Sequence, residues 1–171
     1  MSRYGHVLGA PHILKFSKLS DDAFMPYRVT PLSAGMDLCS PKPYLIRPYK
    51  RLLIKLDLQV EIPIGYYGKL ESKSGLTLTQ GYMVGAGVID QDFTGNLGVI
   101  VFNMSKRDIR IQRGDAIAQM LLIPIALSTP LEEHELYVND RQEGFGYMDR
   151  QRNSRVAPDT AQDSKCCCNI Q

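Results

Sequence analysis

The sequence has few of the residues from which metal centres and nucleophilic catalytic sites are usually built. Among its 171 residues there is no tryptophan, and the three histidines, His6, His12 and His134, are scattered. Cys39 stands alone, while the other three cysteines are consecutive at 166–168, so they cannot form a set of internal disulfides. No CxxC pair is present, which excludes a zinc ribbon. Chemistry must therefore rest on carboxylates, arginine, lysine and backbone groups.

A large excess of charge of either sign is also missing. The formal net charge is +2, whereas nucleic-acid binders normally carry a strong basic excess, so we expect no nucleic-acid partner. The excess lies entirely in residues 150–171, and residues 1–149 are neutral overall. This last segment is polar and lacks aromatic residues, which is typical of disorder. The sequence therefore predicts one folded domain over residues 1–149 and a disordered tail over residues 150–171.

Long apolar runs are absent as well. No stretch reaches the eighteen or so apolar residues of a membrane-spanning helix, and the first thirty residues hold no run of signal-peptide length. Ser2 occupies the position where myristoylation needs glycine. We therefore expect a cytoplasmic or nuclear protein that reaches a membrane only through its tail.

Apolar residues in the body alternate with polar ones. Leucine, isoleucine and valine occupy every second position over residues 52–62, which predicts one half-buried strand. Three more strands are expected, at residues 97–102, 107–112 and 117–127. Pro124 in the last of these indicates an edge position or a bulge, and a short helix fits residues 74–80. Short strands at regular spacing predict an all-β sandwich or barrel.

Residues 85–96 combine glycines, two carboxylates and an aromatic residue. Glycines allow the backbone to approach a ligand closely. Asp90 follows two apolar residues at a predicted strand end, where a carboxylate can act as a general base toward water. Phe93 can cover one face of a ring-shaped ligand. On spacing alone, a β-hairpin whose acids cap the turn remains the favoured interpretation.

The same segment resembles the third motif of the trimeric dUTPase (deoxyuridine triphosphate nucleotidohydrolase) family. Four further motifs resemble those of the family in the same order, at residues 34–38, 68–76, 113–119 and 141–146. The resemblance implies a distorted β-barrel or jelly roll of the dUTPase type. It also implies a homotrimer whose active sites are each assembled from several chains, and a Mg²⁺-dependent dUTP diphosphatase of nucleotide metabolism that forms dUMP and pyrophosphate.

The resemblance further implies a role for each matching residue. Asp90 would activate the water that attacks the α-phosphorus, and Phe93 would pack on the deoxyribose and exclude a 2′-hydroxyl. The backbone of the hairpin over residues 82–90, including Gly87, would read the uracil, and Phe145 would stack over it. The remaining substrate contacts fall to Lys73, Ser74, Gly75, Gln119, Arg141 and Gly146, with Asp37 in support. Mg²⁺ would be held by the triphosphate and water, without a dedicated protein site.

The motifs around the phosphates depart from the family pattern. Lys73 stands where the family usually has arginine, so a planar fork of donors is lost. Glu71 brings a negative charge near the triphosphate unless it points outward, and Tyr147-Met148-Asp149 replace a Ser-Thr-Gly sequence. We therefore expect weakened dUTP hydrolysis. The alternative is a catalytically impaired, dUTPase-derived interaction or signalling protein, held at a membrane by its tail.

The tail ends in Cys168-Asn169-Ile170-Gln171, which fits a C-a-a-X farnesylation site. Cys166 and Cys167 are candidate palmitoylation sites beside it. One lipid chain binds a membrane only marginally, so stable anchoring needs a second lipid or basic residues. The alternatives are an unmodified, reactive cysteine cluster and a tail of no consequence.

Three charged residues in or near the motifs have structural interpretations. Asp115 is expected to set a turn. Arg113 is expected to pair with a neighbouring acid or another subunit, and His134 is expected to be solvated between two glutamates.

Overall fold

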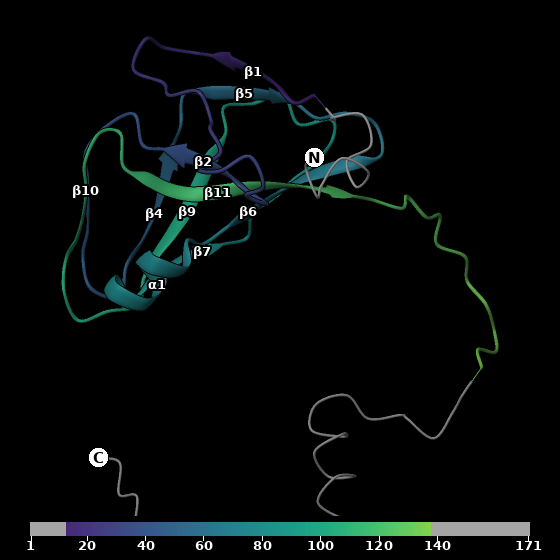
Figure 1. The fold of residues 1–171 in the computed structure, drawn as a ribbon. Coiled ribbons are helices and arrows are strands. Elements are labelled where there is room, and N and C mark those ends of the chain that lie inside the picture. The colour runs from purple at the N-terminus through teal and green to yellow at the C-terminus, as the bar shows by residue number, and fades with distance from the viewer. Residues whose placement is uncertain (1–12, 138–171) are drawn as a thin grey trace, which may run out of the picture. The chain divides into compact units, whose positions relative to one another are not determined.

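The computed structural model describes residues 13–137 (Figure 1). The strands in this part of the chain are β1 Lys15–Lys18, β2 Met36–Cys39, β3 Tyr44–Ile46, β4 Arg51–Lys55, β5 Leu58–Glu61, β6 Tyr66–Glu71, β7 Tyr82–Gly85, β8 Val88–Ile89, β9 Gly98–Asn103, β10 Ile109–Ile111 and β11 Ala116–Pro124. The helix α1 spans Ser74–Gln80. The all-β class and the short helix at residues 74–80 are thus confirmed. No helix in the described residues is long and apolar enough to cross a membrane.

The chain divides into two units, residues 1–128 and residues 129–171. All the strands and α1 belong to the first unit. In the second, the described residues 129–137 contain neither strand nor helix. The predicted domain boundary at residues 149 and 150, and the predicted disorder beyond it, lie outside the described residues.

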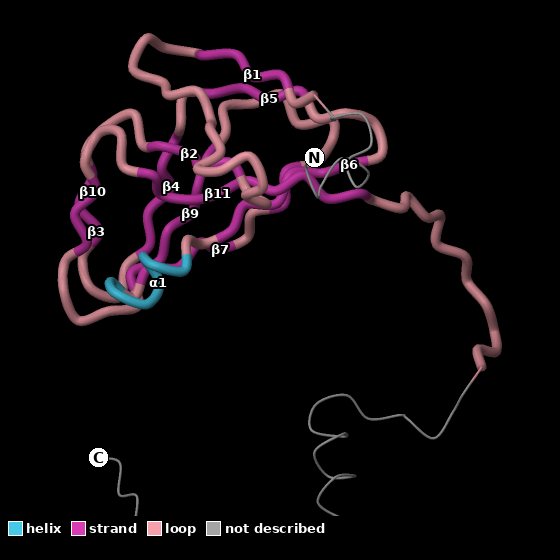
Figure 2. The backbone as a smooth tube through the Cα atoms, viewed as in Figure 1, coloured by secondary structure: helices cyan, strands magenta, loops and turns pink. Residues whose placement is uncertain are grey.

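The strands pair antiparallel in four sheets. The largest has the order β2-β11-β6-β8 and the next β4-β9-β7, while β1 pairs with β5 and β10 with β3. Figure 2 shows β3 and β10 side by side at one edge of the first unit, near α1. A single apolar core draws its fully buried side chains from several of these sheets, including Leu38, Ile54, Leu58, Val99 and Met120.

The strand predicted over residues 52–62 is two strands in different sheets, so this prediction is wrong in its length. The break falls at Asp57, whose φ of +55° is incompatible with an extended strand. Asn96 holds the break, because its Oδ1 accepts from Asp57 N at 3.0 Å and its Nδ2 donates to the carboxylate at 3.0 Å. The predicted inward set of apolar residues is nevertheless buried on both sides of the break, with Leu52 only partly so.

Pro124 occupies an edge position, although β11 as a whole lies between β2 and β6. β2 pairs with β11 only as far as Met120, so beyond that residue β11 pairs with β6 alone. Pro124 is its last residue, opposite Tyr66, where a missing N–H interrupts little of the ladder. The strand does contain an irregularity, but this lies between Ala116 and Ala118.

Candidate active site

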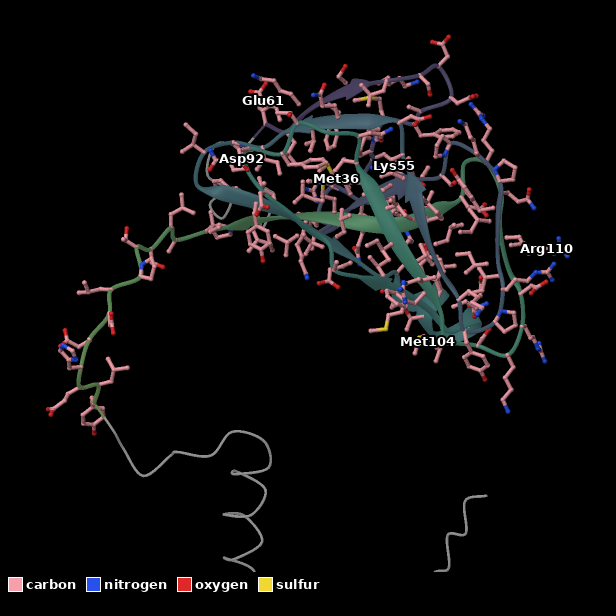
Figure 3. The ribbon with its side chains drawn as sticks, turned by 180° about the vertical axis from the view of Figure 1, so that it is seen from behind. Met36, Lys55, Glu61, Asp92, Met104 and Arg110 are labelled. Atoms are coloured by element: carbon pink, nitrogen blue, oxygen red, sulfur yellow. The ribbon has the colours of Figure 1, made fainter. Side chains whose placement is uncertain are left out.

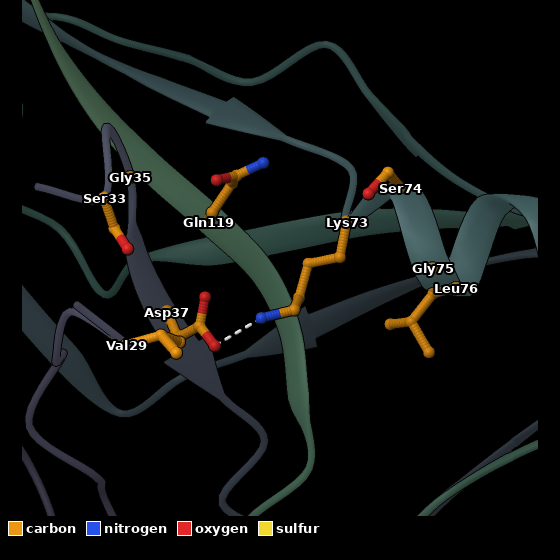
Figure 4. A pocket seen from close by; sticks show the side chains of 9 residues that line it. All are labelled: Val29, Ser33, Gly35, Asp37, Lys73, Ser74, Gly75, Leu76 and Gln119. Carbon is orange, nitrogen blue, oxygen red and sulfur yellow. Dashed lines mark hydrogen bonds and ion pairs between the residues drawn. The ribbon is translucent and has the colours of Figure 1, made fainter.

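A cavity of about 390 Å³ lies where β2, β11 and the start of α1 meet (Figure 4). Its lining residues are Val29, Ser33, Gly35, Asp37, Lys73, Ser74, Gly75, Leu76 and Gln119. Five of the predicted site residues, drawn from three separate motifs, are therefore brought together here. They are Asp37, Lys73, Ser74, Gly75 and Gln119.

A lysine–aspartate ion pair crosses this cavity. Lys73 immediately precedes α1 in an extended conformation, and its Nζ donates to Asp37 Oδ2 on β2 (Figure 4). The Asp37 side chain is 8% exposed and that of Lys73 28%. The pairing gives a buried carboxylate the cation that it needs. It also fixes the ammonium group at the cavity.

Glu71 does not line the cavity. Its side chain is exposed and pairs with Lys69 at 3.8 Å. Of the two orientations considered for Glu71, the outward one is therefore the one adopted. Its negative charge stays outside the lining of the cavity.

Gln119 and Ser72 join the floor of the cavity to the neighbouring sheet. Gln119 Nε2 donates to the Ser72 carbonyl at 3.1 Å, and Ser72 Oγ accepts from Val84 N at 2.8 Å. Gly35 packs directly beneath Gln119, since a Cβ on Gly35 would lie 2.5 Å from Gln119 Oε1. Sequence reasoning gave neither Ser72 nor Gly35 a role, although both lie within the matched motifs.

The turn between β7 and β8 brings the backbone close to β6. Ala86 and Gly87 both have positive φ, at +56° and +89°. Leu70 N donates to the Gly87 carbonyl at 2.7 Å, and a Cβ on Gly87 would lie 2.6 Å from the Leu70 carbonyl oxygen. Only glycine fits both the conformation and the space.

Asp90 and Phe93 lie in the turn after β8, away from this cavity. Phe93 N donates to the Asp90 carbonyl at 3.1 Å. Asp90 is exposed, and Phe93 is 37% exposed. Phe93 lines a different cavity of about 320 Å³, together with Gln59 and Gln91. Neither residue lines the first cavity, so one chain keeps the predicted water-activating acid apart from the predicted phosphate contacts.

Two buried groups carry raised pKa values. Burial, with the Asp37 charge in second place, raises the pKa of the Cys39 thiol. Burial also raises the pKa of the Tyr82 phenol, whose hydroxyl donates to the Ile117 carbonyl at 2.5 Å. Both groups therefore stay protonated at neutral pH and act as packing elements.

The charged residues with structural interpretations are placed as predicted. Arg113 pairs with Asp22 at 3.3 Å and lies 4.7 Å above the Phe24 ring. Asp115 accepts from Gln112 N at 2.7 Å and so sets the turn before β11. His134 is exposed.

The last motif and the tail lie outside the described residues. This applies to the predicted substrate contacts Arg141, Phe145 and Gly146. It applies equally to the candidate lipidation sites Cys166, Cys167 and Cys168.

Comparison with known proteins matches residues 21–148 to the model of the dUTPase family. A deoxyuridine 5′-triphosphate nucleotidohydrolase of fowlpox virus (strain NVSL) is 43% identical over 133 residues, covering 75% of this chain and 92% of its own. The enzyme of the same name from Mus musculus is 40% identical, covering 78% and 81%. The solved structure of the Staphylococcus bacteriophage 80alpha dUTPase with dUPNHPP superposes with a TM-score of 0.74 at 28% identity, covering 80% of this chain and 98% of that one. This chain belongs to the dUTPase family.

Proposed function

We propose that this chain hydrolyses dUTP to dUMP and pyrophosphate, the substrate being that named for its relatives. One observation carries the proposal above all. Residues from three separate motifs that the family resemblance assigns to substrate binding line one cavity of about 390 Å³. Charge and hydrogen-bonding groups suited to a triphosphate therefore converge in one place.

Lys73 and Ser74 supply the binding groups for the phosphates. The Lys73 ammonium and the Ser74 hydroxyl both reach the cavity. A charge-assisted contact from an ammonium to a phosphate oxygen is about twice as strong as a neutral hydrogen bond. Asp37 positions Lys73 but also neutralises part of its charge. The cavity therefore binds phosphate more weakly than it would if Lys73 were unpaired.

The catalytic step requires Asp90 to face the phosphates. An aspartate that orients a water contributes roughly 10²–10⁴-fold to rate as a general base. Because Asp90 is exposed and does not line the cavity of its own chain, we propose a homotrimer. In it, Asp90 and Phe93 of one subunit complete the cavity of another. Phe93 then covers the deoxyribose, and the tightly held turn at Gly87 fixes the backbone that reads the uracil.

Magnesium enters this scheme with the substrate, as the Mg²⁺ complex of dUTP. Among the described residues no three His, Cys, Asp or Glu side chains are grouped for a metal ion. A single carboxylate, Asp37, lines the cavity. Mg²⁺ is commonly bound through one or two carboxylates with the remaining ligands from phosphates and water. This donor set therefore suits a metal that the triphosphate carries.

The test is release of pyrophosphate by the purified full-length chain with dUTP and Mg²⁺. Asp90→Asn should lower kcat by about 10²-fold or more while dUTP binding is retained. Asp92→Asn is the matched control, because Asp92 is exposed in the same turn. Absence of pyrophosphate at high protein concentration, with dUTP still bound, would contradict the proposal.

The second candidate function is a dUTPase-derived interaction protein with impaired catalysis. The observation that favours it is the cavity's only cation among the described residues, a lysine already engaged by Asp37. In this case the chain acts in the cytoplasm or nucleus, and lipidation at Cys168 brings it to a membrane. Intact-mass measurement of protein from a eukaryotic cell tests the lipid. An unmodified Gln171 carboxyl terminus would contradict it.

A further inference from the structure

Six cationic side chains gather on two neighbouring loops and on the strand residues beside them, in a region that the proposed function does not use. We call them the basic face, which consists of Arg47, Lys50, Arg51, Lys106, Arg107 and Arg110, all exposed. They lie around the β3–β4 connection and the β9–β10 connection. The formal charge of the whole chain is only +2. The basic face is therefore a strong local concentration of charge, balanced by acids elsewhere.

A buried asparagine holds the two loops together. Asn103 is 1% exposed, and its Nδ2 donates to the Ile46 carbonyl at 2.9 Å and to the Arg107 carbonyl at 2.7 Å. Its backbone N–H donates to the Lys50 carbonyl at 2.8 Å, and its Oδ1 accepts from Ser105 N at 2.9 Å. Every polar group of the Asn103 side chain is thus used to fix loop backbone. The cations above it are carried on an ordered support.

Most of this charge has no internal counterion. Arg47 pairs with Asp108 at 3.1 Å. Within residues 13–137, no other member of the basic face forms an ion pair. Lys106 and Arg107 also border a surface cavity of about 410 Å³, which Thr79 and Ser105 line as well. The surface is therefore available to an anionic partner.

Exposed apolar side chains are interspersed with these cations. Tyr49 is 64% exposed, Met104 59% and Leu45 40%. Leu45 on β3 lies directly opposite Arg110 on β10, so both side chains emerge on the same face. In Figure 3, the Arg110 side chain projects outward at the edge of the first unit, and Met104 is labelled at its lower end. Large apolar groups exposed beside unpaired cations are typical of surfaces that meet a membrane interface.

We propose that the basic face docks this protein on an anionic phospholipid membrane. The cations meet lipid phosphates and carboxylates, and Tyr49, Met104 and Leu45 enter the headgroup layer. A single-stranded nucleic acid fits less well, because it calls for several aromatic stacking platforms and the basic face exposes one tyrosine. This surface also supplies the basic signal that a single lipid at the C-a-a-X cysteine needs for stable anchoring. The proposal goes beyond dUTP hydrolysis and does not depend on it.

The experiment measures partition of the full-length chain, made in bacteria and so unprenylated, onto vesicles. Vesicles of phosphatidylcholine with 30% phosphatidylserine are compared with pure phosphatidylcholine vesicles at 100 mM salt. Binding should be at least about tenfold stronger to the anionic vesicles. Arg107→Gln with Arg110→Gln should weaken it by about fivefold per charge removed. Lys18→Gln with Lys55→Gln removes the same charge outside the basic face and should leave binding within about twofold.

Equal binding to both kinds of vesicle, or equal loss in both double variants, would overturn the proposal. So would tighter binding to a 30-nucleotide single-stranded DNA than to anionic vesicles, with the same sensitivity to Arg107 and Arg110. Circular dichroism checks that each variant is folded. If the Arg107 and Arg110 pair is not, Lys50→Gln with Arg51→Gln makes the same test on the other loop. Pyrophosphate release, measured in parallel, should be unchanged in all of these variants.

Discussion

The hydroxyl oxygen of Ser72 accepts a hydrogen bond from the backbone N–H of Val84 at 2.8 Å. Ser72 follows β6, whereas Val84 belongs to β7, so the bond connects two different sheets. The Ser72 carbonyl also accepts from Gln119, a residue of the cavity. The dUTPase motif that residues 68–76 resemble usually has proline at this position. This chain thus ties the proposed phosphate site to the hairpin that we propose reads the uracil, through a side chain that proline does not have.

Ser72→Ala should therefore lower the free energy of unfolding by about 1–2 kcal/mol, because the Val84 N–H loses its partner. Urea denaturation monitored by circular dichroism measures this. Ser72→Thr keeps the hydroxyl and serves as the control, with stability close to that of the parent chain. If Ser72→Ala and Ser72→Thr are equally stable, the bond contributes nothing.

Much of the fold followed from the period-two pattern, because burial of alternate side chains is a local property. Leu58 and Ile54 were correctly predicted to face inward. The single strand predicted to contain both of them is in fact two strands. The break at Asp57 could not be predicted in the same way, because it depends on Asn96, which is 39 residues away. Strand order is also non-local: Pro124 indicated an edge position, but nothing near it in the sequence shows that the same strand lies between β2 and β6.

The motifs predicted which residues belong to the candidate site, because a motif specifies residue types. They did not predict which of these residues come together within one chain. Asp37, Lys73 and Gln119 converge on one cavity, whereas Asp90 lies in a turn away from it. The role of Ser72 could not be predicted, because it depends on a hydrogen bond from Val84 in another sheet. Nothing in the sequence around Ser72 indicates this partner.

Lys73 offers a direct test of the cavity's electrostatics. Lys73→Met leaves the buried Asp37 carboxylate unpaired and should lower stability by about 3 kcal/mol. Adding Asp37→Asn to it removes the stranded charge and should recover part of that loss. Thermal denaturation of the two variants and the parent measures both effects. A double variant no more stable than Lys73→Met would show that the ion pair is not the source of the loss.

Lys73→Arg restores the planar fork that the family usually carries here. It should lower KM for dUTP, because two parallel donors hold a phosphate better than one ammonium. The measurement is steady-state pyrophosphate release. An unchanged or higher KM would mean that the lysine is not what weakens phosphate binding.

Two glycines in the matched motifs should respond in opposite ways to alanine. Gly87→Ala forces a side chain into a φ of +89° and to 2.6 Å from the Leu70 carbonyl oxygen. It should cost about 2 kcal/mol or more in stability. Gly75→Ala is the matched control, since Gly75 lies in α1 with nothing within 4 Å of a new Cβ. Helix propensity alone makes that change neutral or stabilising by up to about 1 kcal/mol. Equal melting temperatures would contradict the account of Gly87.

Tyr82 should make stability fall at high pH. Burial raises the pKa of its phenol well above the ordinary value of 10.0. At a pH between 10 and this raised pKa, the unfolded chain releases the Tyr82 proton while the folded chain keeps it. Each pH unit above 10 then removes about 1.4 kcal/mol. The contribution is fully present below pH 10 and is lost as the pH rises.

Urea denaturation at pH 8 and pH 11 measures this dependence. Tyr82→Phe should abolish the part of the loss in stability at pH 11 that comes from Tyr82 ionisation. At pH 8 the same variant should be about 1 kcal/mol less stable than the parent, because the hydrogen bond to the Ile117 carbonyl is lost. Tyr49→Phe, at an exposed tyrosine, should leave the pH dependence unchanged. If the unfolding free energy of Tyr82→Phe falls with pH as steeply as that of the parent, Tyr82 is not the source of the pH dependence.

The separation of Asp90 from the cavity leads to the sharpest prediction about assembly. If one subunit's Asp90 completes another subunit's cavity, two inactive variants should restore activity when they share a trimer. Asp90→Asn provides intact cavities, and Lys73→Gln provides intact Asp90 groups. In a trimer that contains both variants, an intact cavity meets an intact Asp90 in about one of the three sites. Activity should therefore return to about that fraction of the parent value.

The mixed oligomers are obtained by co-expression with two different affinity tags and purification on both. Asp90→Asn mixed with the Asp90→Asn/Lys73→Gln double variant is the control, because no arrangement of those chains contains an intact Asp90. Recovery in the first mixture and none in the control establishes a site shared between subunits. Doubly tagged oligomers without recovered activity would mean that Asp90 and the cavity of one chain must meet within that chain.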